Sequence, residues 1–146
     1  MDTKSILKQV EIFEGLDDDQ LDAVAKCVVE SRVPAGPRVI EEGCPGEAFH
    51  VITEGKVKVE KGDGEAAVTL SELGPGHHFG EMSLLDAVPT SASVTTLEDT
   101  GLLSIGRLDL EVLLSWDTVL ASKMWRTFAL QLSQRLREAN EKLFAR

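Results

Sequence analysis

Apolar side chains recur every three or four positions at both ends of the chain, which predicts helices there. Near the N-terminus we expect two short helices, over residues 4–11 and 17–27. Asp17 is a suitable N-cap for the second, because its carboxylate can accept from free amides of the first turn. Beyond residue 107 the helical spacing returns. Its apolar stripe consists of Ala121, Trp125, Phe128, Leu132, Leu136, Ala139 and Leu143.

Between these helical parts, apolar and polar side chains alternate and glycine and proline recur, which favours short strands joined by turns. Val57 and Val59 alternate with charged neighbours, and Asp63-Gly64 fits a tight hairpin turn before a return strand that begins near Val68. The pattern is typical of a β-roll or jelly-roll barrel. We therefore expect a mostly β fold with flanking helices, forming one domain over residues 1–146: N-terminal helices in 1–27, the β-roll in 28–105 and C-terminal helices in 107–146.

A short apolar segment interrupts the alternation late in the β-region. Residues 81–86 contain enough apolar positions for one or two helical turns, which Pro89 would end. Strands should resume over residues 91–97 and 100–105. Phe-Gly-Glu at 79–81 stands at the start of this inserted helix. A glycine there permits close backbone approach, and the free amides of a first helical turn attract an anion. The segment therefore predicts the backbone part of a phosphate site, to which a cation would have to be added.

The composition is that of an ordinary globular protein with an acidic surface. Of 146 residues, 42% are hydrophobic and 27% charged, and the net charge of -10 disfavours electrostatic capture of nucleic acid or anionic lipid. The N-terminus is too polar for a signal peptide, and no apolar stretch approaches a membrane span. We expect a cytoplasmic protein without nucleic-acid or membrane partners. Cys27 and Cys44 lack the spacing of a metal or cluster site.

The order of elements and two groups of residues resemble a known family. The line VPAGPRVIEEGCPGEAFHVITEGKVKV, with Gly43, Gly46 and Gly55, resembles the first hairpins of the cyclic-nucleotide-binding domain. The line FGEMSLLDAVPTSASV resembles the phosphate-binding cassette of that family, in which Phe-Gly-Glu is followed by a leucine and later by Pro-Arg with small residues. The resemblance implies a regulatory protein of the catabolite-activator type. It implies cAMP or cGMP as ligand, no other cofactor and no enzymatic activity.

The resemblance also implies roles for individual residues. Glu81 would hold the ribose 2'-hydroxyl, and the amides of residues 80–84 would hold the cyclic phosphate. The family's arginine, which pairs with the phosphate, is replaced by Thr90. Asn140 of the last helix would cover the base, or else is an ordinary exposed helix residue. The implied ligand-binding residues are Phe79, Gly80, Glu81, Met82, Ser83, Leu84, Thr90, Ser91, Ala92 and Asn140.

The replacement at Thr90 leaves the phosphate without its usual cation. Residues 62–106 contain no lysine or arginine, although they contain several acids. Losing a buried charge-assisted pair costs on the order of 2 to 5 kcal/mol, so a cyclic nucleotide would bind roughly thirtyfold to several thousandfold more weakly. Lys56, Lys58, Arg107 or an arginine of the last helix is a candidate substitute. Otherwise the basic residues of that helix form a solvated face: Arg126, Arg135, Arg137, Lys142 and Arg146.

We therefore interpret the chain as a stand-alone regulatory or sensor module that binds a cyclic nucleotide weakly, or a different small ligand. One alternative is a degenerate domain that serves only dimerisation or contact with an unknown protein partner. The apolar stripe could pack on its own β-roll or form a homodimer seam over residues 117–143. The other alternative is a cupin-like metal enzyme using His50, His77, His78 and Glu81, although the usual His-x-His spacing is missing. We expect no catalytic and no metal-binding residues.

Overall fold

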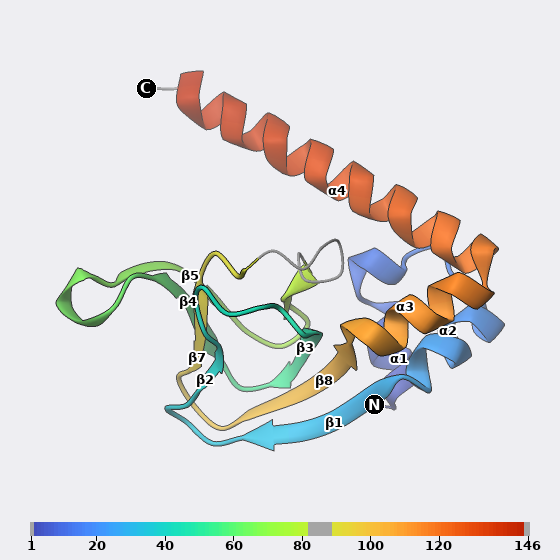
Figure 1. Ribbon diagram of the computed structural model, residues 1–146, viewed down its shortest axis with the longest axis horizontal. Coiled ribbons are helices and arrows are strands. Elements are labelled where there is room, and N and C mark those ends of the chain that lie inside the picture. The colour runs from blue at the N-terminus through green and yellow to red at the C-terminus, as the bar shows by residue number, and fades with distance from the viewer. Residues whose placement is uncertain (1, 82–88, 145–146) are drawn as a thin grey trace.

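Helices precede and follow an antiparallel β-roll (Figure 1). This computed structural model describes residues 2–81 and 89–144. Its helical elements are α1 (Thr3–Lys8), the 3-10 turn η1 (Glu11–Phe13), α2 (Asp18–Ala25), the 3-10 turn η2 (Gly64–Ala66), α3 (Arg107–Trp116) and α4 (Thr118–Phe144). Its strands are β1 (Val28–Val33), β2 (Arg38–Ile40), β3 (Ala48–Glu54), β4 (Val57–Lys61), β5 (Val68–Leu73), β6 (His78–Phe79), β7 (Ser93–Thr96) and β8 (Thr100–Gly106).

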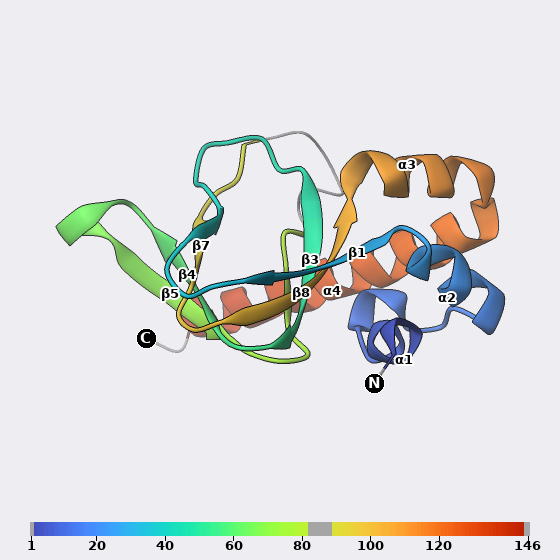
Figure 2. The same cartoon turned by 90° about the horizontal axis from the view of Figure 1, so that it is seen from below.

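The strands form two four-stranded sheets, in the orders β1-β8-β3-β6 and β2-β7-β4-β5. All their pairings are antiparallel, and β8 lies between β1 and β3 in the first sheet. Figure 2 shows α1, α2 and α3 at one end of the β-roll, while the β4–β5 hairpin projects from the other. The predicted mostly β fold with flanking helices is confirmed, and the two strands expected late in the β-region are β7 and β8.

Two clusters of buried apolar side chains hold the elements together. The first joins the β1-β8-β3-β6 sheet to the helices, with Phe13 and Phe49 packed edge to face at 5.9 Å between ring centroids and Phe128 of α4 in the same cluster. The second fills the β-roll itself and contains side chains from both sheets: Ile52, Val57, Phe79, Val94 and Leu102. Because Phe79 is one of these, the start of the predicted cassette is anchored in the interior of the β-roll.

The N-terminal helices are shorter than their sequence pattern predicts. The first ends at Lys8, and η1 follows because a 3-10 turn brings both Ile12 and Phe13 into the core. The second spans Asp18–Ala25 and has Asp17 as its N-cap, as predicted. There the Asp17 carboxylate accepts from the Gln20 amide at 2.8 Å and the Gln20 side chain accepts from the Asp17 amide at 2.9 Å. This reciprocal capping box satisfies two otherwise free donors.

The tight hairpin turn predicted at Asp63-Gly64 is wrong. Lys61 still pairs with Val68, so residues 62–67 form a longer loop that contains η2. The Asp63 carboxylate of this loop accepts from Nη2 of Arg38, a residue of β2, at 2.8 Å. The return strand β5 begins at Val68 as expected, but that side chain is 59% exposed at the edge of the sheet.

The long helix α4 faces the core with a different stripe from the one predicted. It begins after Asp117, whose carboxylate accepts from the Leu120 amide at 3.0 Å. Its buried side chains are Leu120, Met124, Phe128 and Gln131. Of the predicted stripe, Phe128 is buried, whereas Trp125 is 39% and Leu136 63% exposed. The helix is therefore rotated so that its first half packs on its own chain through residues adjacent to the predicted ones.

The second half of α4 leaves the N-terminal helices and extends across the β-roll (Figure 1). The Lys123 ammonium donates to the Gln20 side chain of α2 at 2.8 Å, which ties the first half to the helical end of the molecule. All side chains from 134 to 144 are exposed. Among the described residues, none of the helices combines the length and apolar character needed to cross a membrane.

Candidate functional site

The segment that resembles a phosphate cassette begins at β6, where three of the predicted site residues lie side by side. Phe79 packs in the β-roll interior, and Gly80 follows with a φ of +83°. A Cβ on Gly80 would lie 2.6 Å from the Ala48 carbonyl oxygen, so this close approach of two backbones requires glycine. Glu81 is then directed toward α4. The predicted contacts of Met82, Ser83 and Leu84 lie outside the described residues.

A cavity of about 320 Å³ opens beside this segment. Its volume is at the lower end of the range for small-molecule sites. One side of the lining is apolar and belongs to the β-roll interior, and the other is polar and includes one residue of α4. The lining residues are Ile40, Val59, Ser71, Leu73, His78, Phe79, Gly80, Glu81, Thr90, Ser91, Ala92, Val94 and Arg135. Six of the predicted ligand-binding residues are thus brought together: Phe79, Gly80, Glu81, Thr90, Ser91 and Ala92.

Glu81 forms an ion pair across this cavity with Arg135 of α4. Arg135 Nη1 donates to Glu81 Oε1 at 2.9 Å, and His78 Nδ1 lies 3.5 Å from Glu81 Oε2. The Glu81 side chain is only 12% exposed. Burial alone would raise the pKa of Glu81, but the His78 ring, its own backbone amide and the Arg135 guanidinium together outweigh burial and lower that pKa to about 2. Glu81 is therefore a carboxylate at neutral pH.

Within the described part of the chain, Arg135 is the one lysine or arginine that lines this cavity, so the solvated face proposed for the basic residues of α4 is wrong at this position. It lies four residues after the buried Gln131 and continues the buried stripe of the helix toward the site. The other candidate substitutes point elsewhere. Lys56 lies 3.8 Å from Glu72, Lys58 3.2 Å from Glu60 and Arg107 3.2 Å from Glu111.

Thr90 precedes β7 and is hydrogen-bonded to the loop between β2 and β3. Its hydroxyl donates to the Glu41 carbonyl oxygen at 2.6 Å, and its amide donates to the Cys44 carbonyl oxygen at 2.9 Å. It also accepts from the Gly43 amide at 2.9 Å. These bonds hold Thr90 at the wall of the cavity, to which its side chain brings no charge. Asn140 is exposed on α4 and does not line the cavity.

The histidines proposed for a metal centre are dispersed. His50 Nδ1 is 2.6 Å from Ser104 Oγ, and burial lowers the pKa of His50 to about 4, so its ring is neutral. His77 accepts from the Gly74 amide at 3.0 Å, while the His78 ring packs 5.2 Å from that of Phe49. Within residues 2–81 and 89–144, no group of three or more histidine, cysteine or acidic side chains is placed to hold a metal ion.

Seven residues of the cavity wall are not among the predicted ligand-binding residues, and two of these, His78 and Arg135, lie next to Glu81. His78 precedes Glu81 by three positions, so its proximity could have been inferred from the cassette. Arg135 is separated from Glu81 by 54 positions. Its signal is the spacing Met124, Phe128, Gln131 and Arg135, in which two polar residues extend a helical apolar stripe.

Comparisons with known proteins agree with the fold. Residues 30–117 match the family described as "Cyclic nucleotide-binding domain". The chain is 35% identical over 138 residues to the "Cyclic AMP receptor protein" of Thermus thermophilus, a match that covers 94% of this chain and 62% of that protein. The chain thus spans about three fifths of the length of that relative.

Solved structures show the same arrangement. The N-terminal domain of a transcriptional regulator from Streptomyces coelicolor has a TM-score of 0.78 and 31% identity, covering 93% of this chain and 95% of that one. The regulatory domain of Toxoplasma gondii PKA, crystallised with cAMP, has a TM-score of 0.70 and 29% identity, covering 75% of this chain and 42% of that one. The resemblance found from the cassette and the glycine spacing is confirmed.

Proposed function

The chain belongs to the cyclic nucleotide-binding domain family, a family of regulatory proteins, and we propose that it is a sensor module whose small ligand binds in the cavity beside Glu81. In this proposal a cyclic nucleotide binds weakly, or a different small ligand takes its place. The bound ligand acts on α4. The complexes of the related proteins support a nucleotide-like ligand, because the PKA regulatory domain of Toxoplasma gondii was crystallised with cAMP.

The observation that carries the proposal is the ion pair between Glu81 and Arg135. Glu81 is on the wall of the cavity, whereas Arg135 belongs to the helix that spans the molecule from the N-terminal helices to the β-roll (Figure 1). A ligand that hydrogen-bonds Glu81 competes directly with Arg135. If the ligand binds more tightly to the form in which the Glu81–Arg135 ion pair is broken, its binding would shift the position of α4. The coupling needs no further relay.

The role of Thr90 predicts how a cyclic nucleotide behaves. The Arg135 charge is already engaged by Glu81, and Thr90 brings only a hydroxyl that donates to the Glu41 carbonyl oxygen. A phosphate monoanion would have to share the guanidinium with Glu81, break the ion pair or remain unpaired. We therefore expect natural protein to bind cyclic nucleotides with affinities weaker by a factor of about thirty or more than a protein with an arginine at position 90.

Calorimetric titration of cAMP and cGMP into the natural protein and into Thr90→Arg, at one salt concentration, tests the proposal. We expect weak or undetectable heats from the natural protein and binding at least about thirtyfold tighter by the variant. Micromolar binding by the natural protein would contradict the electrostatic reasoning. Absence of binding by both proteins, with the variant folded as judged by circular dichroism, would exclude cyclic nucleotides as ligands.

A second candidate function, dimerisation through α4, is favoured by a specific feature. That helix exposes Trp125 at 39%, Leu136 at 63% and Leu143 at 62%. Their spacings of eleven and seven residues place these side chains on one face of the helix, which resembles a two-chain seam more than a solvated surface. We propose a homodimer through residues 117–143. This contact is compatible with the sensor or, alone, would make the chain a module for protein contact.

The cupin-like alternative is tested separately. Stoichiometric iron, zinc or manganese in protein purified without chelator, measured by mass spectrometry, would support a metal enzyme. A metal content far below one ion per chain would leave the sensor and the contact module as the candidates.

A further inference from the structure

The strand β1 lies at the edge of the first sheet, and we propose that it pairs, antiparallel and in a single register, with β1 of a second copy of this chain. This surface is separate from α4 and from the cavity beside Glu81. A two-fold axis at the contact joins the first sheets of the two copies into one continuous sheet.

The outer edge of β1 is open. Among the described residues, the backbone of Val28–Val33 pairs with β8, and no other element forms a backbone hydrogen bond with it. Figures 1 and 2 show no described segment beyond this strand. Its four central side chains are exposed, and that of Val29 is 64% exposed. The outward N–H and C=O groups of such a strand are a template for another strand.

The alternation of these outward groups limits the registers that two β1 strands can adopt. In an antiparallel ladder the N–H and C=O of one residue point to the same side, and the side alternates along the strand. The two-fold axis therefore passes through a residue and not between two residues. An axis through Glu30 places two carboxylates opposite each other, and one through Arg32 places two guanidinium groups so, which destabilises the pair. Axes nearer the strand ends pair fewer residues.

An axis through Ser31 is the register in which the side chains match. It places Glu30 opposite Arg32 of the partner subunit, and the symmetry forms this pair twice. It also places Val29 opposite the partner subunit's Val33. Pairs of opposite charge and pairs of β-branched residues both stabilise neighbouring strands. The sequence Val-Glu-Ser-Arg-Val of β1 is thus complementary to itself in the antiparallel direction.

The two charged side chains are available for this pairing. Glu30 is exposed and takes part in none of the ion pairs in the described part of the chain. The Nη1 atom of Arg32 contacts Glu54 of β3 across β8, where the intervening residue is Gly101. The Arg32 side chain is 64% exposed, so the remaining donors of its guanidinium can face a carboxylate on a neighbouring strand.

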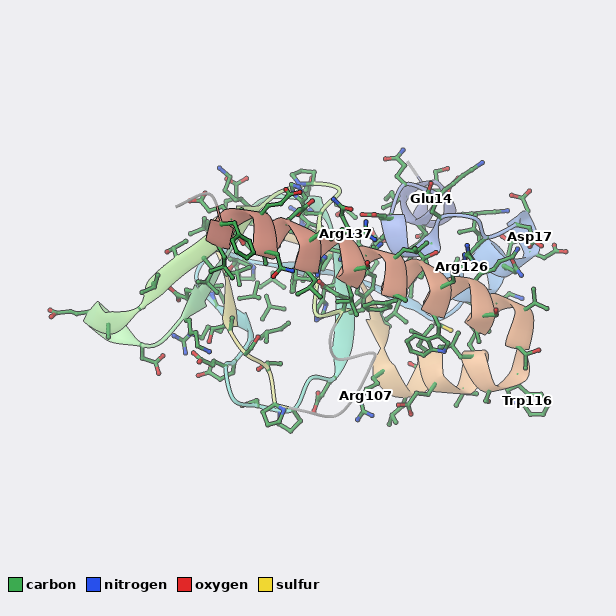
Figure 3. All side chains as sticks on the ribbon, turned by 90° about the horizontal axis from the view of Figure 1, so that it is seen from above. Glu14, Asp17, Arg107, Trp116, Arg126 and Arg137 are labelled. Atoms are coloured by element: carbon green, nitrogen blue, oxygen red, sulfur yellow. The ribbon has the colours of Figure 1, made fainter. Side chains whose placement is uncertain are left out.

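The strand edge leads into an apolar groove that the second copy would partly cover. Pro34 of the partner subunit has no N–H to donate, so it ends the ladder, and in this register it lies opposite Val28. Val28 borders a groove of about 510 Å³ lined by Lys26, Cys27, Val28, Val29, Asp109, Val112, Leu113 and Trp116. Trp116 is 85% exposed at the end of α3 away from the β-roll (Figure 3). Covering part of this groove adds apolar burial to a short ladder.

The contact is small, and the net charge of -10 on each copy opposes it, so we expect a dissociation constant of about 0.1 to 1 mM. Protein at about 10 μM would then be dissociated at this surface. Where the α4 surface is used as well, two different two-fold contacts link the copies into assemblies larger than a dimer.

Charge reversal tests the register. The background is Leu136→Glu, which removes the α4 surface, and the mean mass is followed by small-angle X-ray scattering between about 10 μM and about 1 mM. Glu30→Arg and Arg32→Glu each place like charges opposite each other across the axis, whereas the two substitutions together restore opposite charges. Glu65→Arg is the control, because it makes the same change of net charge at an exposed position of η2.

We expect the background protein to associate as its concentration rises. Each single reversal should weaken this association by at least about tenfold, and the double reversal should bring it back to within about threefold of the background. Glu30→Arg makes the chain less negative, so a non-specific association would become stronger, as in Glu65→Arg. Weakening by Glu30→Arg is therefore specific to the pairing.

A disulfide trap tests the same register in the chain with its α4 surface intact. Cys27→Ser and Cys44→Ser remove the natural thiols, and Ser31→Cys then places two thiols opposite each other across the axis. Thr69→Cys on β5, an exposed position at the edge of the other sheet, is the control. Under mild oxidation at about 0.5 mM, Ser31→Cys should form a cross-linked dimer at least about tenfold faster than Thr69→Cys.

Three results would each overturn the proposal. The first is no rise in mass of the folded background protein up to about 1 mM, and the second is a folded double reversal that associates no better than the single reversals. The third is Ser31→Cys cross-linking no faster than Thr69→Cys. The trap decides the matter even if Leu136→Glu or a charge reversal does not fold.

Discussion

Removing the Arg135 guanidinium should destabilise the fold by about 1 to 2 kcal/mol at neutral pH. Glu81 has a pKa of about 2 against an ordinary value of 4.5, a difference that corresponds to about 3 kcal/mol in favour of its charged form. Arg135 is one of three groups that produce this lowering, beside His78 and the Glu81 amide. The contribution of Arg135 is therefore only part of the 3 kcal/mol. A value of about 1 to 2 kcal/mol also lies between those of exposed and buried ion pairs, because the side chain of Arg135 is 51% exposed and that of Glu81 12%.

The assay is urea unfolding of the natural chain, Arg135→Gln, Glu81→Gln and the double variant, followed by circular dichroism. The coupling between the two positions should equal about 1 to 2 kcal/mol at pH 7. A carboxylate with a lowered pKa contributes stability above its unfolded value of 4.5 and loses it as the pH falls through about 2. The coupling should therefore decline over that window. Arg137→Gln, which removes a guanidinium bound only to Ser133, should cost less than about 0.5 kcal/mol.

A coupling near zero at pH 7, with both single variants folded, would refute the reasoning. It would mean that Glu81 is stabilised by His78 and its own amide alone, and that Arg135 is a surface charge. A coupling of the expected size that persisted unchanged to pH 2 would also contradict it, because the interaction would then not depend on the ionised carboxylate.

Three further predictions concern the frame of the site. Gly55→Ala should cost more than about 3 kcal/mol in urea unfolding, because its φ is +91° and a Cβ would overlap the Asp99 carbonyl oxygen, whereas Gly43→Ala, with φ +86° and open space, should cost about 1 kcal/mol. Burial lowers the pKa of His50 from 6.5 to about 4, so the free energy of unfolding should be highest above pH 6.5 and fall as the pH drops to about 4. In His50→Phe, the fall in the free energy of unfolding between these pH values should be smaller by up to about 3 kcal/mol. Leu136→Glu should leave monomer stability within about 0.5 kcal/mol and abolish any dimer seen by analytical ultracentrifugation, and an unchanged dimer would exclude this surface.

The architecture could be predicted because its signals are local. The capping box at Asp17 involves residues three positions apart, and the β-roll is marked by alternation and by glycines such as Gly55 and Gly80, whose positive φ angles no other residue adopts easily. The β4–β5 loop was missed because its contacts include a residue outside the segment, which a local turn pattern does not contain. Arg38 belongs to another strand and binds Asp63 across 25 positions.

The cation of the site could not be predicted from the cassette, since it comes from a distant helix whose rotation is set by packing. The apolar residues of α4 fit two neighbouring stripes, and the sequence alone favours the one with Trp125 and Leu136. In the structure the core takes Leu120, Met124 and Phe128 instead, because these side chains meet the cluster formed by the N-terminal helices and the first sheet. Once that rotation is fixed, position 135 must face the cavity.

The Glu81–Arg135 ion pair, which depends on this rotation, also limits the free energy with which a ligand can move α4. A ligand that takes the Glu81 carboxylate frees Arg135, and the free energy available to move the second half of α4 is then at most the coupling between the two residues, about 1 to 2 kcal/mol. Such a coupling shifts a two-state equilibrium by roughly five- to thirtyfold. The first half of the helix remains held by Phe128 in the core and by Lys123 on Gln20. A ligand response should accordingly appear in hydrogen exchange beyond residue 131 and leave the exchange of residues 120–128 unchanged.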